Sequence, residues 1–283
     1  MPKYYVYIII AISISLAAAL VYYYAQTISS RAEGEELLVY AAIVTKPVLE
    51  EAKSIFESKY NVKVIINYGS SGALLSAIET YKKGDVFIVA SPDFLLRAAI
   101  RGVVDLNKTR PVTLAYLVPA IIVQKGNPKN ISKLEDLAKP GIRIVIGDPQ
   151  TVPAGLYAVE LLVANGLWEN VSKNIIAYAA NVEQAVQWVS AGVADATIAW
   201  HTSYYSNPSK YDIVWIEPSK IPKISYIPGI VTKYAKNPVL AQEFLEFLAT
   251  DGEVKEIWRK YGFFATLEEA KKYAPYAVVE EVS

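Results

Sequence analysis

The sequence of 283 residues contains no cysteine, and its 28 lysines and arginines are balanced by 28 aspartates and glutamates. Without cysteine the protein has no disulfide, no thiolate nucleophile, no Cys-ligated metal and no lipid attached through an N-terminal cysteine. Without net charge it has no overall field to attract nucleic acid or an anionic bilayer, so we expect no nucleic-acid partner. Histidine is scarce as well, and His201 is the single candidate for a histidine general base.

A long uncharged run at the N-terminus is a candidate membrane anchor. The residues from Tyr4 to Ala25 carry no charge, and as a helix they would extend roughly 33 Å at ~1.5 Å per residue, enough to cross a bilayer. Lys3 precedes the run and Glu33 follows it, which favours a body outside the cytoplasm. We expect an uncleaved anchor on the extracytoplasmic face of the cell membrane. A signal peptide cleaved near Ala19 is the alternative.

The rest of the chain alternates between strand-like and helix-like patterns. Hydrophobic residues make up 53% of the sequence, enough for the cores of two modest α/β domains. The alternation predicts mostly parallel, doubly wound sheets. Strands are expected at 37–42, 62–67, 85–90, 117–124, 143–146, 174–178, 194–199 and 213–216. Helices are expected at 47–60, 74–82, 154–164, 182–190, 237–250 and 252–261.

Two lobes with a cleft between them follow from this order. Chain crossings near Ala115 and Ile224 would join the lobes, and such a cleft is the usual place for a small ligand. The expected segments are a transmembrane anchor or signal peptide (1–25), a tether (26–36), lobe 1 (37–115), lobe 2 (116–223) and a segment that returns to lobe 1 (224–283).

Four strand-to-helix junctions carry small or neutral residues. The most informative is Tyr68-Gly69-Ser70-Ser71-Gly72-Ala73, and similar junctions occur at 44–47, 152–155 and 181–183. The first amides of a helix have no partner within the helix, and its positive end attracts anions. Four such helix ends that converge would surround a small oxyanion.

Other interpretations of these junctions remain open. Ser70 and Ser71 could simply cap a helix, and Pro47 and Pro153 mark first-turn positions without identifying a ligand. A serine at such a turn could also be the nucleophile of a hydrolase, but the junction does not fit Gly-x-Ser-x-Gly, and only His201 could serve as its base. A membrane-tethered sensor that reports an anion to another protein is a further alternative.

Several motifs, in this order, resemble the extracytoplasmic molybdate-binding proteins of ABC transporters. The resemblance extends over nearly everything from Leu37 to Phe264, and its most specific part is the block from Gly147 to Ala158. The motifs are Val39-Tyr40-Ala41-Ala42, Gly69-Ser70-Ser71-Gly72, Gly84-Asp85-Val86-Phe87, Gly147-Asp148-Pro149 with Val152-Pro153-Ala154-Gly155, and Lys260-Tyr261-Gly262-Phe263.

The resemblance implies a type II periplasmic-binding-protein fold with a hinge and an interlobe cleft. It implies a monomer, not an enzyme, that captures molybdate or tungstate without a counter-cation or cofactor and delivers it to an ABC permease and its ATPase. Sulfate or another tetrahedral oxyanion is the alternative ligand.

In that family hydroxyls and backbone amides hold the anion. By resemblance, Ser71 is the binding serine, and Ala154 and Val182 supply amides. Two positions depart from the pattern. Val44 stands where a serine is usual; it can still supply an amide, but a hydroxyl would have to come from Thr45 or be missing. Trp200 replaces a tyrosine but could donate its indole N–H.

Overall fold

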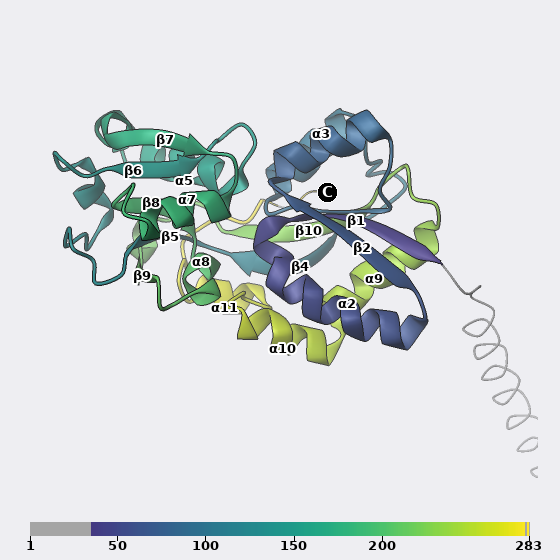
Figure 1. Ribbon diagram of the computed structural model, residues 1–283. Coiled ribbons are helices and arrows are strands. Elements are labelled where there is room, and N and C mark those ends of the chain that lie inside the picture. Colours follow the sequence, from purple (N-terminus) through teal and green to yellow (C-terminus); the bar gives the residue numbers. More distant parts are fainter. Residues whose placement is uncertain (1–34, 281, 283) are drawn as a thin grey trace, which may run out of the picture.

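The computed structural model describes residues 35–280 and 282, which form two α/β lobes side by side (Figure 1). The sheet of lobe 1 has the order β2-β1-β3-β10-β4. Its strands are β1 (Glu36–Ala42), β2 (Lys63–Gly69), β3 (Val86–Ile88), β4 (Val112–Leu117) and β10 (Ser225–Val231). The sheet of lobe 2 has the order β7-β6-β8-β5-β9. Its strands are β5 (Pro119–Gln124), β6 (Ile144–Gly147), β7 (Ile175–Ala179), β8 (Ala196–Trp200) and β9 (Tyr211–Val214).

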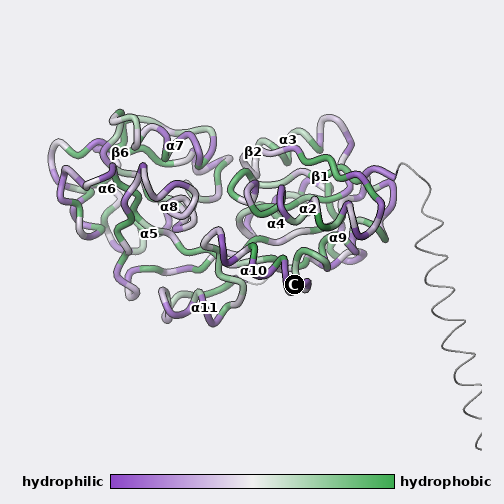
Figure 2. Tube along the Cα trace, turned by 60° about the horizontal axis from the view of Figure 1, so that its bottom comes forward, coloured by the Kyte–Doolittle hydropathy of each residue, from purple (hydrophilic) through white to green (hydrophobic). Residues whose placement is uncertain are grey.

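Helices cover both faces of each sheet, because buried apolar residues of the strands pack on both sides. Hydrophobic stretches of the trace run through both lobes (Figure 2). In lobe 1, one face carries α2 (Lys46–Tyr60), α9 (Pro238–Thr250) and α10 (Gly252–Lys260), and the other carries α3 (Ser71–Tyr81) and α4 (Pro92–Ile100). In lobe 2, α7 (Val182–Ser190) packs on one face. The other face carries α5 (Pro153–Ala164), α6 (Trp168–Val171), α11 (Leu267–Lys271) and η2 (Leu134–Ala138). The remaining short helices are η1 (Ile43–Thr45), α8 (Thr202–Ser206), η3 (Ser172–Asn174) and η4 (Pro218–Lys220).

Both sheets are mixed, but a single strand in each, β10 or β5, runs against the other four, so the strands are mostly parallel, as expected. Strand β1 is parallel to β2 and β3, but β10 is antiparallel to β3 and β4. Likewise β6 is parallel to β7 and β8, whereas β5 is antiparallel to β8 and β9. The antiparallel strands β10 and β5 each follow directly on a crossing between the lobes, so they enter their sheets from the opposite end.

The expected strand at 117–124 is in fact divided between the two sheets. Leu117 ends β4 in lobe 1 and Pro119 begins β5 in lobe 2, so the chain crosses at Val118. Leu117, Val118 and the residues that follow to Val123 are all buried. Because the run is apolar throughout, no change in residue type marks the place where the chain crosses between the lobes. Hydrophobic periodicity therefore could not locate the crossing.

The C-terminal segment contributes to both lobes. Strand β10 and helices α9 and α10 pack in lobe 1. Ala270, Ala274 and Ala277, however, pack in the core of lobe 2. The anchor expected at 1–25 and most of the tether lie outside the described residues. Within the described part of the chain, no helix is both long enough and apolar enough to cross a membrane.

Glycine makes the start of α5 possible, because this helix begins almost in contact with β6. A Cβ on Gly155 would lie 2.0 Å from the carbonyl oxygen of Gly147. We expect Gly155→Ala to lower the free energy of unfolding by about 1–3 kcal/mol, the usual cost of overpacking. Chemical denaturation measures this change. Gly252→Ala is the matched control, because a Cβ there meets nothing within 4 Å; equal stability of the two variants would contradict the prediction.

Candidate functional site

A small cavity with a void volume of ≈ 240 Å³ lies between the two lobes, where several strands end and helices begin. We call it the inner cavity. None of its lining side chains is charged. The lining residues are Ala42, Ile43, Val44, Gly69, Ser70, Ser71, Ala90, Val152, Pro153, Ala154, Val182 and Trp200. Five of the six residues expected to bind the anion, Val44, Ser71, Ala154, Val182 and Trp200, are therefore brought together.

Ser71 is the first residue of α3 and is fully buried. Its Oγ accepts a hydrogen bond from the amide of Ala90 at 3.2 Å, which leaves the hydroxyl proton free to donate. Ser70 also lines the cavity, and although it is the N-cap of α3 its side chain makes no capping hydrogen bond. Ser70 belongs to the junction expected to face an anion, but it was not among the six residues expected to bind it.

The first turn of α5 leaves one free amide. Pro153 has no N–H, and the amides of Gly155 and Leu156 both donate to the carbonyl of Val152. Ala154 therefore presents the unpaired N–H of this turn, next to the cavity. The close approach at Gly155 positions this helix end.

The start of α7 is arranged in a similar way. The Asn181 side chain caps the helix by accepting from the amide of Gln184 at 2.9 Å. The amides of Val182 and Glu183, in the first turn, have no partner within the helix. Val182 lines the inner cavity, so its amide is available there.

At the junction after β1, the Thr45 hydroxyl does not face the inner cavity. Val44 lines the cavity, but Thr45 does not. The Thr45 side chain is fully buried, and its Oγ1 donates to the carbonyl of Ala42 at 2.8 Å. In this arrangement the junction offers the Val44 amide and no hydroxyl.

Trp200 ends β8 and forms part of the cavity wall. Its ring packs edge-on against Tyr157 of α5, with 5.0 Å between the ring centroids. Among the hydrogen bonds of residues 35–280 and 282, none uses the Trp200 indole nitrogen, so this N–H is available to a ligand.

Two hydrogen bonds link the lobes beside the inner cavity. The amide of Gly72 in α3 donates to the carbonyl of Thr151 in lobe 2 at 2.9 Å. Arg97 of α4 donates through Nη1 to the carbonyl of Gln150 at 2.7 Å. These contacts hold the start of α3 close to the loop before α5.

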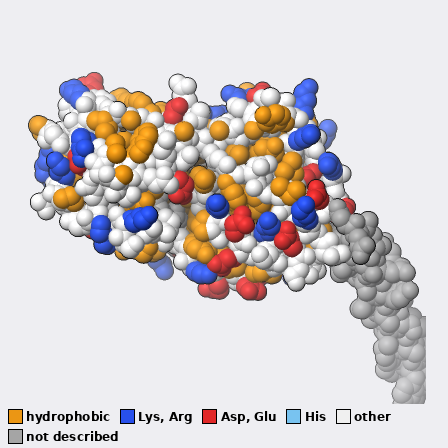
Figure 3. All heavy atoms as spheres, in the orientation of Figure 1, with side chains coloured by type: hydrophobic (Ala, Val, Ile, Leu, Met, Phe, Trp, Pro, Cys, Tyr) orange, Lys and Arg blue, Asp and Glu red, His pale blue; other side chains and the backbone are white. Residues whose placement is uncertain are grey.

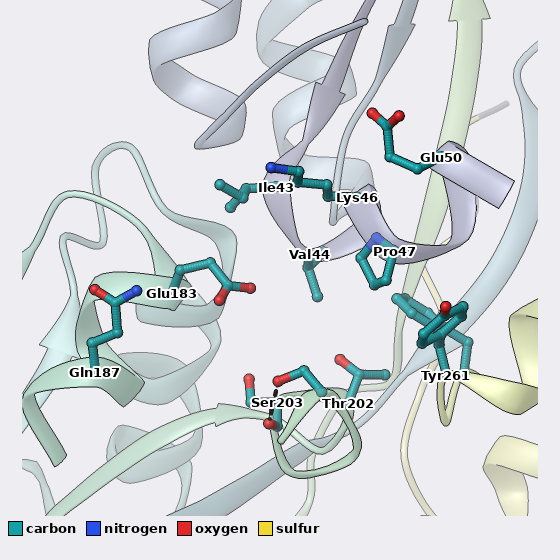
Figure 4. A pocket seen from close by; sticks show the side chains of 12 residues that line it. Ile43, Val44, Lys46, Pro47, Glu50, Glu183, Gln187, Thr202, Ser203 and Tyr261 are labelled. Carbon is teal, nitrogen blue, oxygen red and sulfur yellow. Dashed lines mark hydrogen bonds between the residues drawn. The ribbon is translucent and has the colours of Figure 1, made fainter. Parts of the chain in front are cut away.

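A larger outer cavity, with a void volume of ≈ 1040 Å³, adjoins the inner one and shares Ile43 and Val44 with it. Residues of both lobes line it (Figure 4). Lys46 and Glu183 extend into it from opposite walls, and Thr202 and Ser203 form its floor. The further lining residues are Pro47, Glu50, Gln187, Ser206, Tyr261 and Phe263.

Charge near the site is limited to the outer cavity. Burial raises the pKa of the Glu183 carboxyl, and the positive charge of Lys46 opposes that shift. None of the ion pairs in the described residues joins Lys46 to Glu183. On the surface, positive and negative side chains are interspersed over both lobes on the face shown in Figure 3. The inner cavity is therefore a neutral site whose attraction for anions comes from amides and hydroxyls.

His201 lies in the hinge and does not reach Ser71. Its Nε2–H donates to the carbonyl of Gly262 at 2.7 Å, and its Nδ1 accepts from the amide of Val118 at 3.3 Å. The ring stacks on Phe264, with 4.3 Å between the centroids. Because both ring nitrogens are bonded to the backbone, the arrangement provides no general base for a hydrolase.

Burial lowers the pKa of His201 from its ordinary value of 6.5 to about 4, although the backbone carbonyls of Gly262 and Val118 next to its ring nitrogens partly oppose this. The unfolded chain therefore binds a proton between about pH 6.5 and 4 that the folded chain does not. We expect stability to fall as the pH drops through this window, by about 3 kcal/mol in all, and to level off below it. Denaturation of the wild type and of His201→Gln from pH 7 to 5 tests this. Parallel curves would contradict the prediction.

Two α/β lobes with a small uncharged cavity between them define the class of two-lobed periplasmic binding proteins. The chain belongs to the bacterial extracellular solute-binding protein family, whose model matches residues 37–264.

Named relatives agree with this assignment. The chain is 30% identical to a putative ABC transporter substrate-binding lipoprotein, YvgL, of Bacillus subtilis, over 81% of this chain and 86% of that protein. It is 24% identical to the molybdate-binding protein ModA of Escherichia coli, over 82% and 90% of the two chains. A solved structure, the substrate-binding domain of a putative molybdenum ABC transporter from Clostridium difficile, is 26% identical with a TM-score of 0.61, over 81% and 98%. The resemblance inferred from the motifs is thus confirmed.

Proposed function

We propose that this protein is the binding component of an ABC importer and captures molybdate or tungstate in the inner cavity. The observation that carries the proposal is the convergence of four helix starts from both lobes on one uncharged cavity. Each start presents a free amide, at Val44, Ser71, Ala154 and Val182, and Ser71 adds a hydroxyl. Such a set suits a tetrahedral oxyanion. The names of relatives such as ModA support the same ligand.

Hydrogen bonds from these groups would compensate for burying the anion. A buried dianion is unfavourable unless its oxygens accept hydrogen bonds, and each charge-assisted bond contributes on the order of 1.5–3 kcal/mol. Roughly six or seven such bonds offset the desolvation. The amides, the Ser71 and Ser70 hydroxyls and the Trp200 N–H together reach that number. Because none of these donors carries a full charge, no ion pair has to break when the anion leaves.

Isothermal titration of the full-length chain with molybdate, tungstate and sulfate in the same buffer tests the proposal. Tetrahedral oxyanions of equal charge differ mainly in size, so a rigid cage of donors selects by radius. We expect the two metal oxyanions to bind at least about tenfold more tightly than sulfate, a difference of about 1.4 kcal/mol. If sulfate binds more tightly, the ligand is sulfate and Val44 and Trp200 mark an altered pocket. If none of the three binds, the proposal is wrong.

We also infer that the protein acts as a monomer outside the cytoplasmic membrane, held by its N-terminal segment, and passes the anion to a permease with its ATPase. The uncharged run from Tyr4 to Ala25 supports the anchor. Membrane fractionation of the full-length chain tests this inference. Release of the protein by alkaline carbonate would exclude a spanning anchor.

A further inference from the structure

The boundary between the inner and outer cavities is apolar. Only Ile43 and Val44 line both cavities. The hydroxyl of Thr45, the next residue in the chain, is turned away and donates to the carbonyl of Ala42. The side chains at this boundary therefore offer no hydrogen bond to an oxygen of the anion.

This boundary suits one kind of oxyanion better than another. A bare tetrahedral anion has four terminal oxygens, and each requires donors when it is buried. A monoester has three terminal oxygens and one bridging oxygen, which is a weaker acceptor. The bridging oxygen can face the apolar side chains of Ile43 and Val44 while the Val44 amide donates to a terminal oxygen, and the substituent would then extend into the outer cavity.

The floor of the outer cavity holds a buried polar group without a protein partner. Thr202 is 3% exposed, and its Oγ1 has no hydrogen-bond partner. A buried hydroxyl without a partner destabilises the folded state, so it calls for a specific reason. Thr202 lines the cavity beside Ser203, and a polar group of a ligand would supply the missing bond.

The walls above this floor carry complementary donors and acceptors. Lys46 reaches in from lobe 1, and Glu183 reaches in from lobe 2 (Figure 4). The two side chains are not paired with each other. An uncharged hydroxyl can donate to the carboxylate and accept from the ammonium, whereas a charged substituent would be repelled by one of them. Hydroxyl groups therefore match the outer cavity best.

We propose that the site also takes phosphate monoesters of small hydroxylated compounds, with the phosphoryl group in the inner cavity and the organic part in the outer one. This inference rests on the proposed oxyanion site and extends its range of ligands. The ester oxygen lies at Val44, and the hydroxyls of the substituent bond to Thr202, Lys46 and Glu183.

Titration of the full-length chain with glycerol 3-phosphate, inorganic phosphate and molybdate tests the proposal. Glycerol 3-phosphate binds at least about tenfold more tightly than inorganic phosphate, because its hydroxyls gain bonds that phosphate cannot make. In Thr202→Val the ratio of glycerol 3-phosphate affinity to molybdate affinity falls about tenfold. The melting temperature of this variant does not drop, since the substitution removes an unpaired buried hydroxyl. Thr113→Val, at an exposed position on β4, is the matched control and keeps the wild-type ratio.

The outcomes separate the two hypotheses. If molybdate binds and glycerol 3-phosphate binds no better than inorganic phosphate, the ester proposal is overturned and the molybdate function stands. If glycerol 3-phosphate binds and molybdate does not, the molybdate function fails and the ester proposal stands. An unchanged ratio in Thr202→Val overturns the role of the outer cavity. Lys46→Met, at an exposed position, provides the same test without risk to folding.

Discussion

Replacing Ser71 by alanine lowers the affinity for the oxyanion roughly 10- to 150-fold, as expected for the loss of one charge-assisted hydrogen bond. The buried hydroxyl accepts from the Ala90 amide at 3.2 Å, so its proton points away from that amide and is free for the ligand. Titration calorimetry with molybdate measures the effect. The variant also leaves the Ala90 amide without its acceptor, so its melting temperature should fall slightly.

Ser76→Ala is the control for this experiment. Ser76 is exposed on the same helix, so the change in helix propensity is similar but no cavity contact is lost. Its affinity should equal that of the wild type. If Ser71→Ala also binds normally while remaining folded, the Ser71 hydroxyl does not donate to the ligand, and the other donors must hold the anion.

Gly72→Val should weaken binding roughly 5- to 150-fold by preventing closure of the lobes. A Cβ at this position would lie 2.7 Å from the Cα and 2.9 Å from the carbonyl oxygen of Thr151. These are backbone atoms of the other lobe, so the overlap is relieved only if the lobes separate or the loop before α5 shifts. We expect the added side chain to destabilise the closed, ligand-bound form by about 1–3 kcal/mol, the range for overpacked contacts.

Small-angle scattering and the ligand affinity together distinguish separation of the lobes from a shift of the loop before α5. Small-angle scattering of Gly72→Val in saturating ligand should give a larger radius of gyration than the wild type, because the lobes stay apart. Ala73→Val is the matched control, since Ala73 is the next residue of α3 and is exposed. Unchanged affinity and radius would mean that the Thr151 loop moves freely, and that the Gly72–Thr151 hydrogen bond does not report closure.

Local patterns were enough to predict most elements of this fold. The expected helix at 182–190 coincides with α7, and the expected helix at 154–164 begins one residue after α5 does. These helices have clear starts, because Asn181 is a capping residue and Pro153 favours the first turn. Helix α4 and strands β4 and β10 were not predicted.

The candidate site was predicted only in part, because a sequence motif does not determine which way a side chain turns. Thr45 and Val44 are neighbours, yet Val44 lines the cavity and Thr45 bonds to Ala42. For Ser70 the sequence left a helix cap open as an alternative, and its side chain does not form that cap. The roles of the six expected residues in binding stay predictions.

By itself the sequence determined what is local: the absence of cysteine chemistry, the helix starts with free amides and the order of strands and helices. It could do so because hydrogen-bond satisfaction at a helix end and the periodicity of burial depend on a few neighbouring residues. Only the tertiary structure decided the crossing at Val118, the contact between Gly72 and Thr151, and the outer cavity with Thr202 on its floor. Each of these joins residues far apart in the chain, and their approach depends on how the two lobes pack.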